Sequence, residues 1–207
     1  YECIAQTDAA YAMKGTNMTL ESLTKIRHES SRAVNAENPT GEPGKGGIAA
    51  SELGPSRKGS PCLRNIPVGA TATLADITGP GCIRHIWITV DEKTTDADCF
   101  VLRDLVLRFY WDDDEETSVE CPLGDFFCCG FGRACLVNSM PVAVVPNRGF
   151  NMYFSMPFGA RARITLENQH KNAISAFFYQ IDYTVNDDPF DDDIAYFHAQ
   201  WRRQRLT

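Results

Sequence analysis

Nine short apolar segments between Leu63 and Val185 constrain the fold of this chain more than any other feature. They alternate apolar and polar residues or run continuously apolar, and they are rich in β-branched and aromatic residues. Gly, Pro, Asn or Asp separates them, and no long helical period intervenes. The pattern therefore predicts an antiparallel sandwich or barrel. The segments are residues 63–69, 70–79, 82–90, 105–111, 118–123, 143–146, 150–158, 160–168 and 174–185.

The two segments that flank this β-rich region differ from it in composition and in the spacing of apolar residues. Residues 19–34 carry apolar side chains near helical spacing, which predicts a short N-terminal helix. Residues 35–61 hold six Gly and four Pro, which predicts a long Gly/Pro-rich arm that tethers a neighbour or covers a site. We therefore expect three regions: helix and arm over 1–61, a sandwich over 62–188, and a C-terminal tail over 189–207.

Charge and hydropathy exclude several classes of partner. The 207 residues carry 20 basic and 27 acidic side chains, a net charge of −7, so a nucleic-acid partner is not expected. No run approaches the length of a membrane-spanning helix, and residues 1–15 do not have the form of a signal peptide. A signal removed before Tyr1 would still permit secretion.

The eight cysteines are even in number but contain no CxxC pair, and several occupy apolar, strand-like positions. Buried thiols fit this usage best, which favours a cytoplasmic protein, while disulfides and a metal site stay open as alternatives. The four histidines have no partner at zinc-ligand spacing, and no phosphate-binding or hydrolase-serine motif is present. The sequence therefore predicts neither a metal site nor a cofactor.

Five consecutive acids, Asp112 to Glu116, lie between two strand-like runs. This position predicts a solvated hairpin tip, because Asp favours turns. The alternative is a calcium loop, but the run lacks the DxDxDG arrangement. Glu120 and Asp125 are better candidates for function, since Gly124 follows Pro122 closely and a constrained bend there would aim the Asp125 carboxylate.

Two polar segments contain the residue types of sugar-binding sites, which combine an aromatic face with directed hydrogen bonds. One precedes the Gly-rich arm and the other closes the chain. The alternative is that Trp201 plugs one end of the sandwich while the neighbouring Arg side chains are solvated. The candidate substrate-binding residues are Glu37, Asn38, Asp125, His198, Gln200, Trp201 and Arg202.

Several motifs together resemble the DUF2961 family, glycoside hydrolase family 172. They are SRAVNAENPTGEPGKGG, TLADITGPGCIRHIWIT, LRFYWDDDEETSVECPLGDFF, NMYFSMPF followed by ARARITLEN, and YFHAQWRR, in family order over residues 20–203. The resemblance implies a double jelly roll that assembles as trimers or multiples of them. It also implies retaining hydrolysis of fructofuranosides or arabinofuranosides, including difructose anhydrides, and sugar contacts at the matching candidate residues.

The resemblance covers the N-terminal half of a family chain only, because YFHAQWRR falls at the end of the first jelly roll. The catalytic glutamate pair of the family is expected in the second half and cannot be assigned to residues here. Three interpretations stay open. The chain is part of a longer enzyme, a non-catalytic jelly-roll subunit that binds sugar or builds an assembly, or an enzyme whose site is completed across a symmetric interface.

Overall fold

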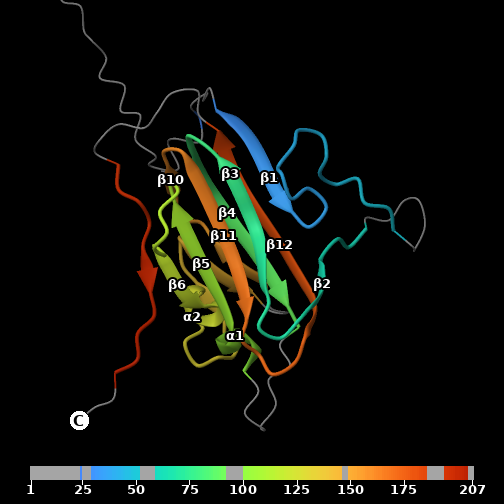
Figure 1. The fold of residues 1–207 in the computed structure, drawn as a ribbon, viewed down its shortest axis with the longest axis vertical. Coiled ribbons are helices and arrows are strands. Elements are labelled where there is room, and N and C mark those ends of the chain that lie inside the picture. The colour runs from blue at the N-terminus through green and yellow to red at the C-terminus, as the bar shows by residue number, and fades with distance from the viewer. Residues whose placement is uncertain are drawn as a thin grey trace, which may run out of the picture.

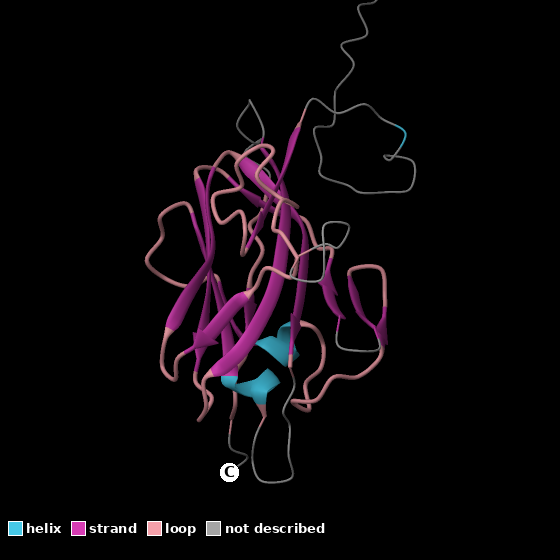
Figure 2. Cartoon of the chain, turned by 90° about the vertical axis from the view of Figure 1, so that its right-hand side faces the viewer, coloured by secondary structure: helices cyan, strands magenta, loops and turns pink. Residues whose placement is uncertain are grey.

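The computed structural model describes Thr24 and residues 29–51, 59–91, 100–145, 149–185 and 194–204. The fold is an all-β sandwich of an eight-stranded and a five-stranded sheet, with two single-turn helices at one end (Figures 1 and 2). The elements are β1 (Ser30–Asn35), β2 (Leu63–Ile66), β3 (Thr71–Thr78), β4 (Gly81–Val90), α1 (Val101–Asp104), β5 (Leu105–Trp111), β6 (Val119–Pro122), α2 (Leu123–Phe126), β7 (Val137–Asn138), β8 (Val142–Val145), β9 (Gly149–Met152), β10 (Met156–Phe158), β11 (Arg161–Asn168), β12 (Ile174–Val185) and β13 (Ala199–Gln200).

The strand order is that of a jelly roll. The larger sheet runs β1-β12-β4-β9-β8-β7, and the smaller sheet runs β13-β6-β5-β11-β3. Four antiparallel pairs, β1 with β12, β3 with β11, β4 with β9 and β5 with β6, are nested in the chain like the two arms of one long hairpin. Successive strands along each arm alternate between the sheets, so the hairpin is rolled up and the predicted fold class is confirmed.

Each of the nine predicted segments contains a strand, because their apolar positions face the interior between the sheets. In β5, Leu107, Phe109 and Trp111 are buried, whereas Arg108 and Tyr110 between them are only half-buried. Five phenylalanines are fully buried in this interior, and they make up much of the core. They are Phe109, Phe127, Phe150, Phe158 and Phe177.

The predicted N-terminal helix is wrong where the structure tests it. Residues 30–34, its expected last turn, form most of β1, which pairs with β12 from Ser30 opposite Val185 to Asn35 opposite Gln180. Tertiary pairing overrides the weak helical spacing here, since β12 offers a long free edge. Most of the remaining predicted helix lies outside the described residues. Each flank thus adds one strand to the sandwich, β1 or β13, and the division into three regions stays a prediction.

The acidic turn is the tip of the rolled hairpin, between β5 and β6. Asp112 and Asp113 have positive φ angles of 53° and 64°, a backbone region that Asp tolerates better than most residues. Asp112 Oδ1 accepts hydrogen bonds from the backbone N–H groups of Ala160 at 2.6 Å and Arg161 at 3.0 Å. Its Oδ2 accepts from Gly159 N–H and from the Tyr196 hydroxyl. The Asp112 carboxylate therefore ties the hairpin tip to the turn between β10 and β11.

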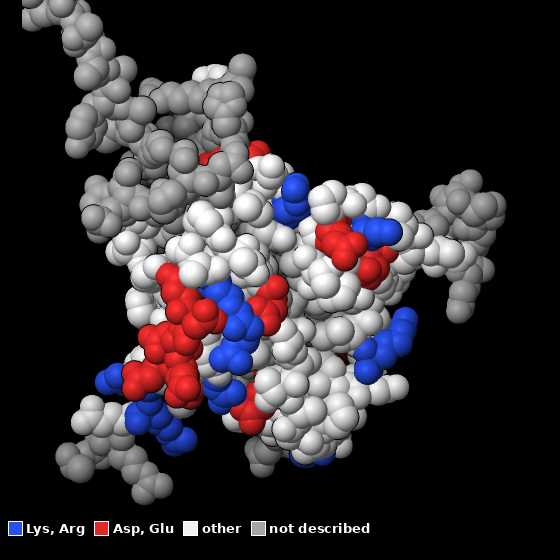
Figure 3. Space-filling view, turned by 45° about the horizontal axis from the view of Figure 1, so that its top comes forward, with Lys and Arg blue, Asp and Glu red and all other residues white. Residues whose placement is uncertain are grey.

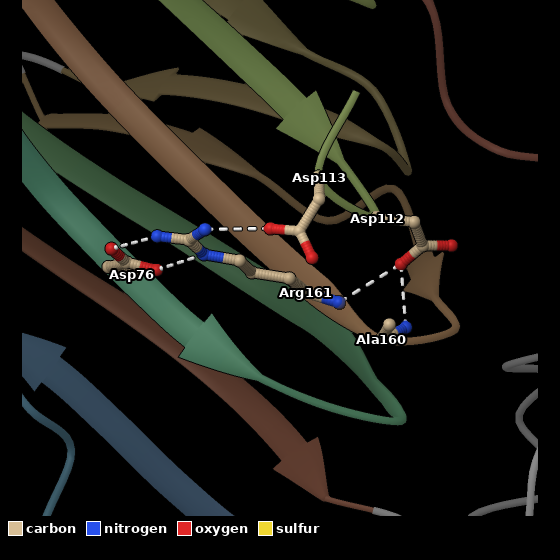
Figure 4. A network of polar contacts seen from close by, with 5 residues as sticks. All are labelled: Asp76, Asp112, Asp113, Ala160 and Arg161. Atoms are coloured by element: carbon tan, nitrogen blue, oxygen red, sulfur yellow. Dashed lines mark hydrogen bonds and ion pairs between the residues drawn. The ribbon is translucent and has the colours of Figure 1, made fainter. Parts of the chain in front are cut away.

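The Arg161 side chain extends this network on the surface of the smaller sheet (Figure 4). Its guanidinium donates to both carboxylate oxygens of Asp76 at 2.7 Å and to Asp113 at 2.7 Å. The hairpin tip is thus partly an anchored structure, while Asp114, Glu115 and Glu116 are exposed as expected. Figure 3 shows a patch of acidic side chains with basic side chains directly beside it.

The imidazole of His85 joins three neighbouring strands of the larger sheet. Its Nδ1 lies 3.0 Å from Asp182 Oδ2 on β12, and its Nε2 lies 3.1 Å from Asn151 Oδ1 on β9. The Asn151 amide nitrogen donates to the carbonyls of Ala143 and Gly149, so its Oδ1 faces the ring as an acceptor. Both ring nitrogens therefore face acceptor oxygens, an arrangement that favours the imidazolium form. The hydrogen bond to Asp182 raises the pKa of His85, although burial opposes this.

Removal of the Asp112 carboxylate should destabilise the fold. Asp112→Ala leaves the donors of the β10–β11 turn without this acceptor, and we expect a loss of about 2 kcal/mol in the free energy of unfolding. Glu115→Ala, a change of an exposed acid in the same turn, should stay within about 0.5 kcal/mol of wild type. Urea denaturation of both variants measures the difference. Equal stabilities of the two variants would contradict the anchoring role.

The stability contributed by His85 should depend on pH. Because its pKa is raised in the folded protein, the contribution is complete below the ordinary value of 6.5 and is lost as pH rises through the raised value. His85→Gln should therefore lower the melting temperature near pH 6 by about 2–4 °C, for a contribution of about 1 kcal/mol, and much less at pH 9. His198→Gln, which changes an exposed histidine, is the control in thermal melts. A deficit that is the same at every pH would argue against the imidazolium.

Candidate functional site

A pocket of about 370 Å³ opens at one edge of the sandwich. It lies between the β6 and β13 edge of the smaller sheet and strands β8 and β9 of the larger sheet, which do not close on each other there. The volume is in the range of small-molecule sites. Most of the lining is apolar or aromatic, and it comprises Cys121, Asp125, Phe126, Cys128, Val142, Met152, Phe154, Phe197, Ala199, Gln200 and Trp201.

The C-terminal tail reaches this edge because β13 adds to β6 as a parallel strand (Figure 1). The backbone N–H of Ala199 donates to Ser118, and that of Trp201 donates to Glu120. The Trp111 indole N–H donates to the Phe197 carbonyl at 2.8 Å, which fixes the chain two residues before β13. The tail is therefore held by main-chain bonds, and its side chains form one wall of the pocket.

Phenylalanines from three separate segments form the apolar part of the pocket. Phe197 of the tail contacts Phe126 of α2, with ring centroids 6.3 Å apart, and Phe154 after β9, with centroids 5.5 Å apart. Such tilted and edge-on contacts are favourable for aromatic rings. Phe154 and Trp201 keep 43% and 41% of their surfaces exposed, so both rings are partly accessible to a ligand.

The polar part of the pocket is centred on Asp125. Arg103 of α1 donates through Nη1 to Asp125 Oδ1 at 3.2 Å and lies 3.1 Å from Oδ2. Oδ2 is buried and accepts no hydrogen bond of good geometry, so this second contact is an ion pair only. The Arg103 guanidinium also lies over the Trp201 ring, 5.3 Å from its centroid, and donates to the Gly130 carbonyl at 2.5 Å. Arg103 thus connects the carboxylate, the indole and the loop after α2.

Burial raises the pKa of Asp125, against the opposing charge of Arg103 and hydrogen bonds from its own backbone and from Trp201. The carboxyl therefore takes up a proton more readily than an ordinary aspartate. A carboxyl poised in this way, beside an aromatic face, can accept from or donate to a sugar hydroxyl or a glycosidic oxygen.

Of the other tail candidates, one lines the pocket directly. Gln200 lines it, and Arg202 Nη2 donates to Gln200 Oε1 at 2.9 Å, which orients the amide. His198 is exposed and is not among the lining residues. The structure thus brings Asp125, Gln200 and Trp201 together, with Arg202 behind the amide.

Glu37 and Asn38 lie elsewhere, in the loop after β1 at the opposite edge of the larger sheet. The two carboxylate oxygens of Glu37 accept from the N–H groups of Gly47 at 2.6 Å and Ala49 at 2.7 Å. The Asn38 side chain is buried and bonds to the backbone of Ala33 and Glu42. Their polar groups are therefore used within the glycine-rich arm.

A second hollow of about 270 Å³ lies beside this loop. Asn38 and Asp182 contribute to it from the loop and from β12, and most of the remaining lining comes from β1 and the arm. It is lined by Ser31, Arg32, Ala33, Asn38, Gly41, Glu42, Pro43, Gly44, Gly46 and Asp182.

The described residues contain neither a metal-ligand cluster nor a membrane-spanning helix. Among them, no group of three or more His, Cys, Asp or Glu side chains could hold a metal ion. The described part of the chain has no helix of the length and apolarity needed to cross a membrane. The six cysteines within the described ranges have free thiols, namely Cys62, Cys82, Cys121, Cys128, Cys129 and Cys135.

Sequence reasoning missed Arg103 and the aromatic wall of the pocket. Arg103 and Asp125 are 22 residues apart, and no spacing rule connects α1 with α2. Phe126, Phe154 and Phe197 look like core residues in the sequence, because each lies in or beside an apolar run. The one available signal was the pair of charged residues Arg103 and Asp104 in a mostly apolar stretch, which suggests ion pairs but does not identify their partners.

The fold and the pocket together define an all-β jelly-roll protein with a partly apolar, carboxyl-containing site at the edge of the sandwich. A sequence model of the family described as GH172 domain-like matches residues 62–181, more than half of the chain. The chain therefore belongs to the GH172 domain-like family, which relates it to glycoside hydrolases. The match includes Asp125 but not Gln200 or Trp201. No curated protein matched the chain.

The Arg103 side chain should control the protonation of Asp125. Arg103→Gln removes the positive charge that lowers the pKa of Asp125, so the pKa should rise further above the ordinary carboxyl value. Carboxyl-detected NMR titration measures this directly, with Arg64→Gln on β2 as the control for a lost surface charge. An Asp125 pKa that is unchanged in Arg103→Gln would show that the ion pair does not govern the site.

Proposed function

We propose that this protein binds furanosides, either fructofuranosides or arabinofuranosides, in the pocket of Asp125 and Trp201 as part of a retaining glycoside hydrolase. The observation that carries the proposal is the pairing of a raised-pKa carboxyl with an exposed indole face. The two side chains are held together by one arginine. A sugar ring stacks on an aromatic face while its hydroxyls bond to the carboxyl and to the Gln200 amide. Family membership supports a carbohydrate ligand.

The number of carboxyl groups in the pocket determines which part of the proposed catalytic site this chain supplies. Retaining hydrolysis requires two carboxyl groups about 5–5.5 Å apart, one as nucleophile and one as acid and base. Of the described residues that line the pocket, Asp125 alone carries a carboxyl. This chain then supplies the substrate-facing wall, with Asp125, Gln200 and Trp201 in contact and His198 and Arg202 at the rim. At least one catalytic carboxylate comes from another polypeptide segment or from another copy of the chain.

Glu37 and Asn38 are proposed to act at a contact between subunits. They hold the glycine-rich arm in shape through the bonds to Gly47, Ala49 and Glu42. We assign the arm to packing on a neighbouring subunit, where it carries these two residues toward a shared sugar site.

We also propose assembly into trimers or multiples of trimers. Support comes from two large apolar side chains, Met140 and Val145, which are 87% and 48% exposed in the β7–β8 hairpin, whose two-residue strand β7 is an edge of the larger sheet. Exposed apolar groups beside a free sheet edge favour association. Sedimentation equilibrium of the native protein tests this, and a monomer at all concentrations would contradict it.

A non-catalytic function is the second candidate. A jelly roll whose described pocket contains one carboxyl can bind sugar without cleaving it, as lectin-like jelly rolls do. Release of reducing sugar from furanosides by the native protein separates the two candidates. Hydrolysis that persists in the purified native protein and falls in Asp125→Asn supports the enzyme, and binding without hydrolysis supports the lectin-like function.

Sugar binding should depend on the carboxyl and on the indole. Titration of methyl α-arabinofuranoside, followed by NMR chemical shifts, should give saturable binding with a dissociation constant on the order of 1 mM. Trp201→Ala and Asp125→Asn should each weaken it at least about tenfold, a loss of about 1.4 kcal/mol. Tyr153→Ala is a matched control, because Tyr153 is 43% exposed like Trp201 but does not line the pocket. Equal loss in the control, or equal affinity for the arabinopyranoside, would contradict the proposal.

A further inference from the structure

Two cysteines beside the pocket lie with their sulfur atoms in contact. Cys129 Sγ and Cys135 Sγ are 3.6 Å apart at the two ends of a short loop between α2 and β7. The loop folds back on itself, because Gly132 N–H donates to the Cys129 carbonyl and Gly132 has a positive φ of 70°. Glycine adopts this backbone conformation without strain. The turn at Gly132 therefore brings the two ends of the loop, and with them the two sulfur atoms, close together.

The two thiols differ in access. Cys135 is exposed, whereas Cys129 is 1% exposed and packs in the core cluster. A reagent in solution can therefore reach one sulfur directly, and the other lies immediately behind it. This arrangement of an exposed thiol with an adjacent second thiol is the geometry of a redox-active pair.

We propose that Cys129 and Cys135 are a thiol modification site that a small-molecule disulfide of the glutathione class converts into an intramolecular disulfide. The Cys135 thiolate attacks one sulfur of the small disulfide and releases the first small thiol, which leaves a mixed disulfide on Cys135. Cys129 then loses its proton and attacks Cys135 Sγ, which releases the second small thiol. Two protein thiols are oxidised to one disulfide, and one small disulfide is reduced to two thiols.

The order of the two steps follows from the surroundings of the sulfurs. Burial raises the pKa of Cys129 to about 11. A hydrogen bond with the Cys135 backbone opposes this shift, and the Cys135 thiol adds to it. The Cys129 thiolate is therefore scarce at neutral pH, and the second attack is the slow one. The mixed disulfide on Cys135 should accumulate first, and its conversion should accelerate as pH rises.

The loop is connected to the pocket by two contacts. The Gly130 carbonyl accepts from Arg103, the same side chain that pairs with Asp125, and Cys128 lines the pocket itself. A disulfide between Cys129 and Cys135 would restrain this wall. Its effect on sugar affinity rests on the function proposed above, whereas the formation of the bond does not.

Peptide mapping of the native protein tests the pairing, because Arg133 lies between the two cysteines. After treatment with oxidised glutathione, alkylation of remaining thiols and trypsin digestion, peptides 109–133 and 134–148 should be joined by a disulfide. The joined pair should be lighter than the two free peptides by two hydrogen atoms. Fragmentation of the joined pair should place the bond on Cys129, although Cys121 and Cys128 are in the same peptide.

Single substitutions give an independent readout. Cys135→Ser, at an exposed position, and Cys129→Ala should abolish the joined pair, whereas Cys128→Ser should retain it. A joined pair that survives in Cys129→Ala and disappears in Cys128→Ser would overturn the assignment. So would a wild-type protein that keeps glutathione on Cys135 without resolving it at alkaline pH.

The consequence for the pocket is measured separately. Furanoside titrations of the oxidised and reduced wild type should differ by at least about twofold in affinity, and those of Cys135→Ser should not differ. If the joined peptides form but neither state binds sugar, the proposed function fails and the redox pair stands. If sugar binds but no joined peptides form, the redox pair fails and the proposed function stands.

Discussion

Packing of the inner faces of two sheets against each other is the constraint on which the rest of this structure depends. Each arm of the rolled hairpin places alternate strands in opposite sheets, so each strand must present its apolar side chains inward. The buried phenylalanines Phe109, Phe150 and Phe177 come from strands far apart in the chain and meet in this interior. Strand order, rather than any local preference, therefore decides which residues become neighbours.

The same constraint creates the candidate site. Two twisted sheets cannot stay in contact along their whole perimeter, and here they part between β6 and β9. The tail fills part of the opening through main-chain bonds to β6, and the short helices α1 and α2 bring Arg103 to Asp125. Partial burial at such an opening raises the pKa of a carboxyl without removing it from solvent. An edge pocket thus combines an apolar wall with a carboxyl group of raised pKa.

The acidic turn illustrates both the reach and the limit of sequence reasoning. Its place between two strands, and hence a hairpin tip, follows from the alternation on either side. The bonds from Asp112 to the turn between β10 and β11 do not follow, because those partners are 47–49 residues away in the chain. The candidates Glu37 and Asn38 show the same limit. Their residue types suit a sugar site, but the sequence does not reveal that their side chains also bond to the backbone of the arm.

The sequence by itself determined the fold class, the nine strand segments and the family, and it named Asp125 and Trp201 as candidates. Those conclusions depend on period-two alternation, turn residues and local motifs, all of which are properties of short stretches. Only the tertiary structure decided that Ser30–Asn35 is a strand, that Arg103 pairs with Asp125, and that two cysteine sulfurs meet beside the pocket. The first two depend on contacts between distant segments, and the third on the backbone path of one loop. Contacts of these kinds leave no periodic signal in the sequence.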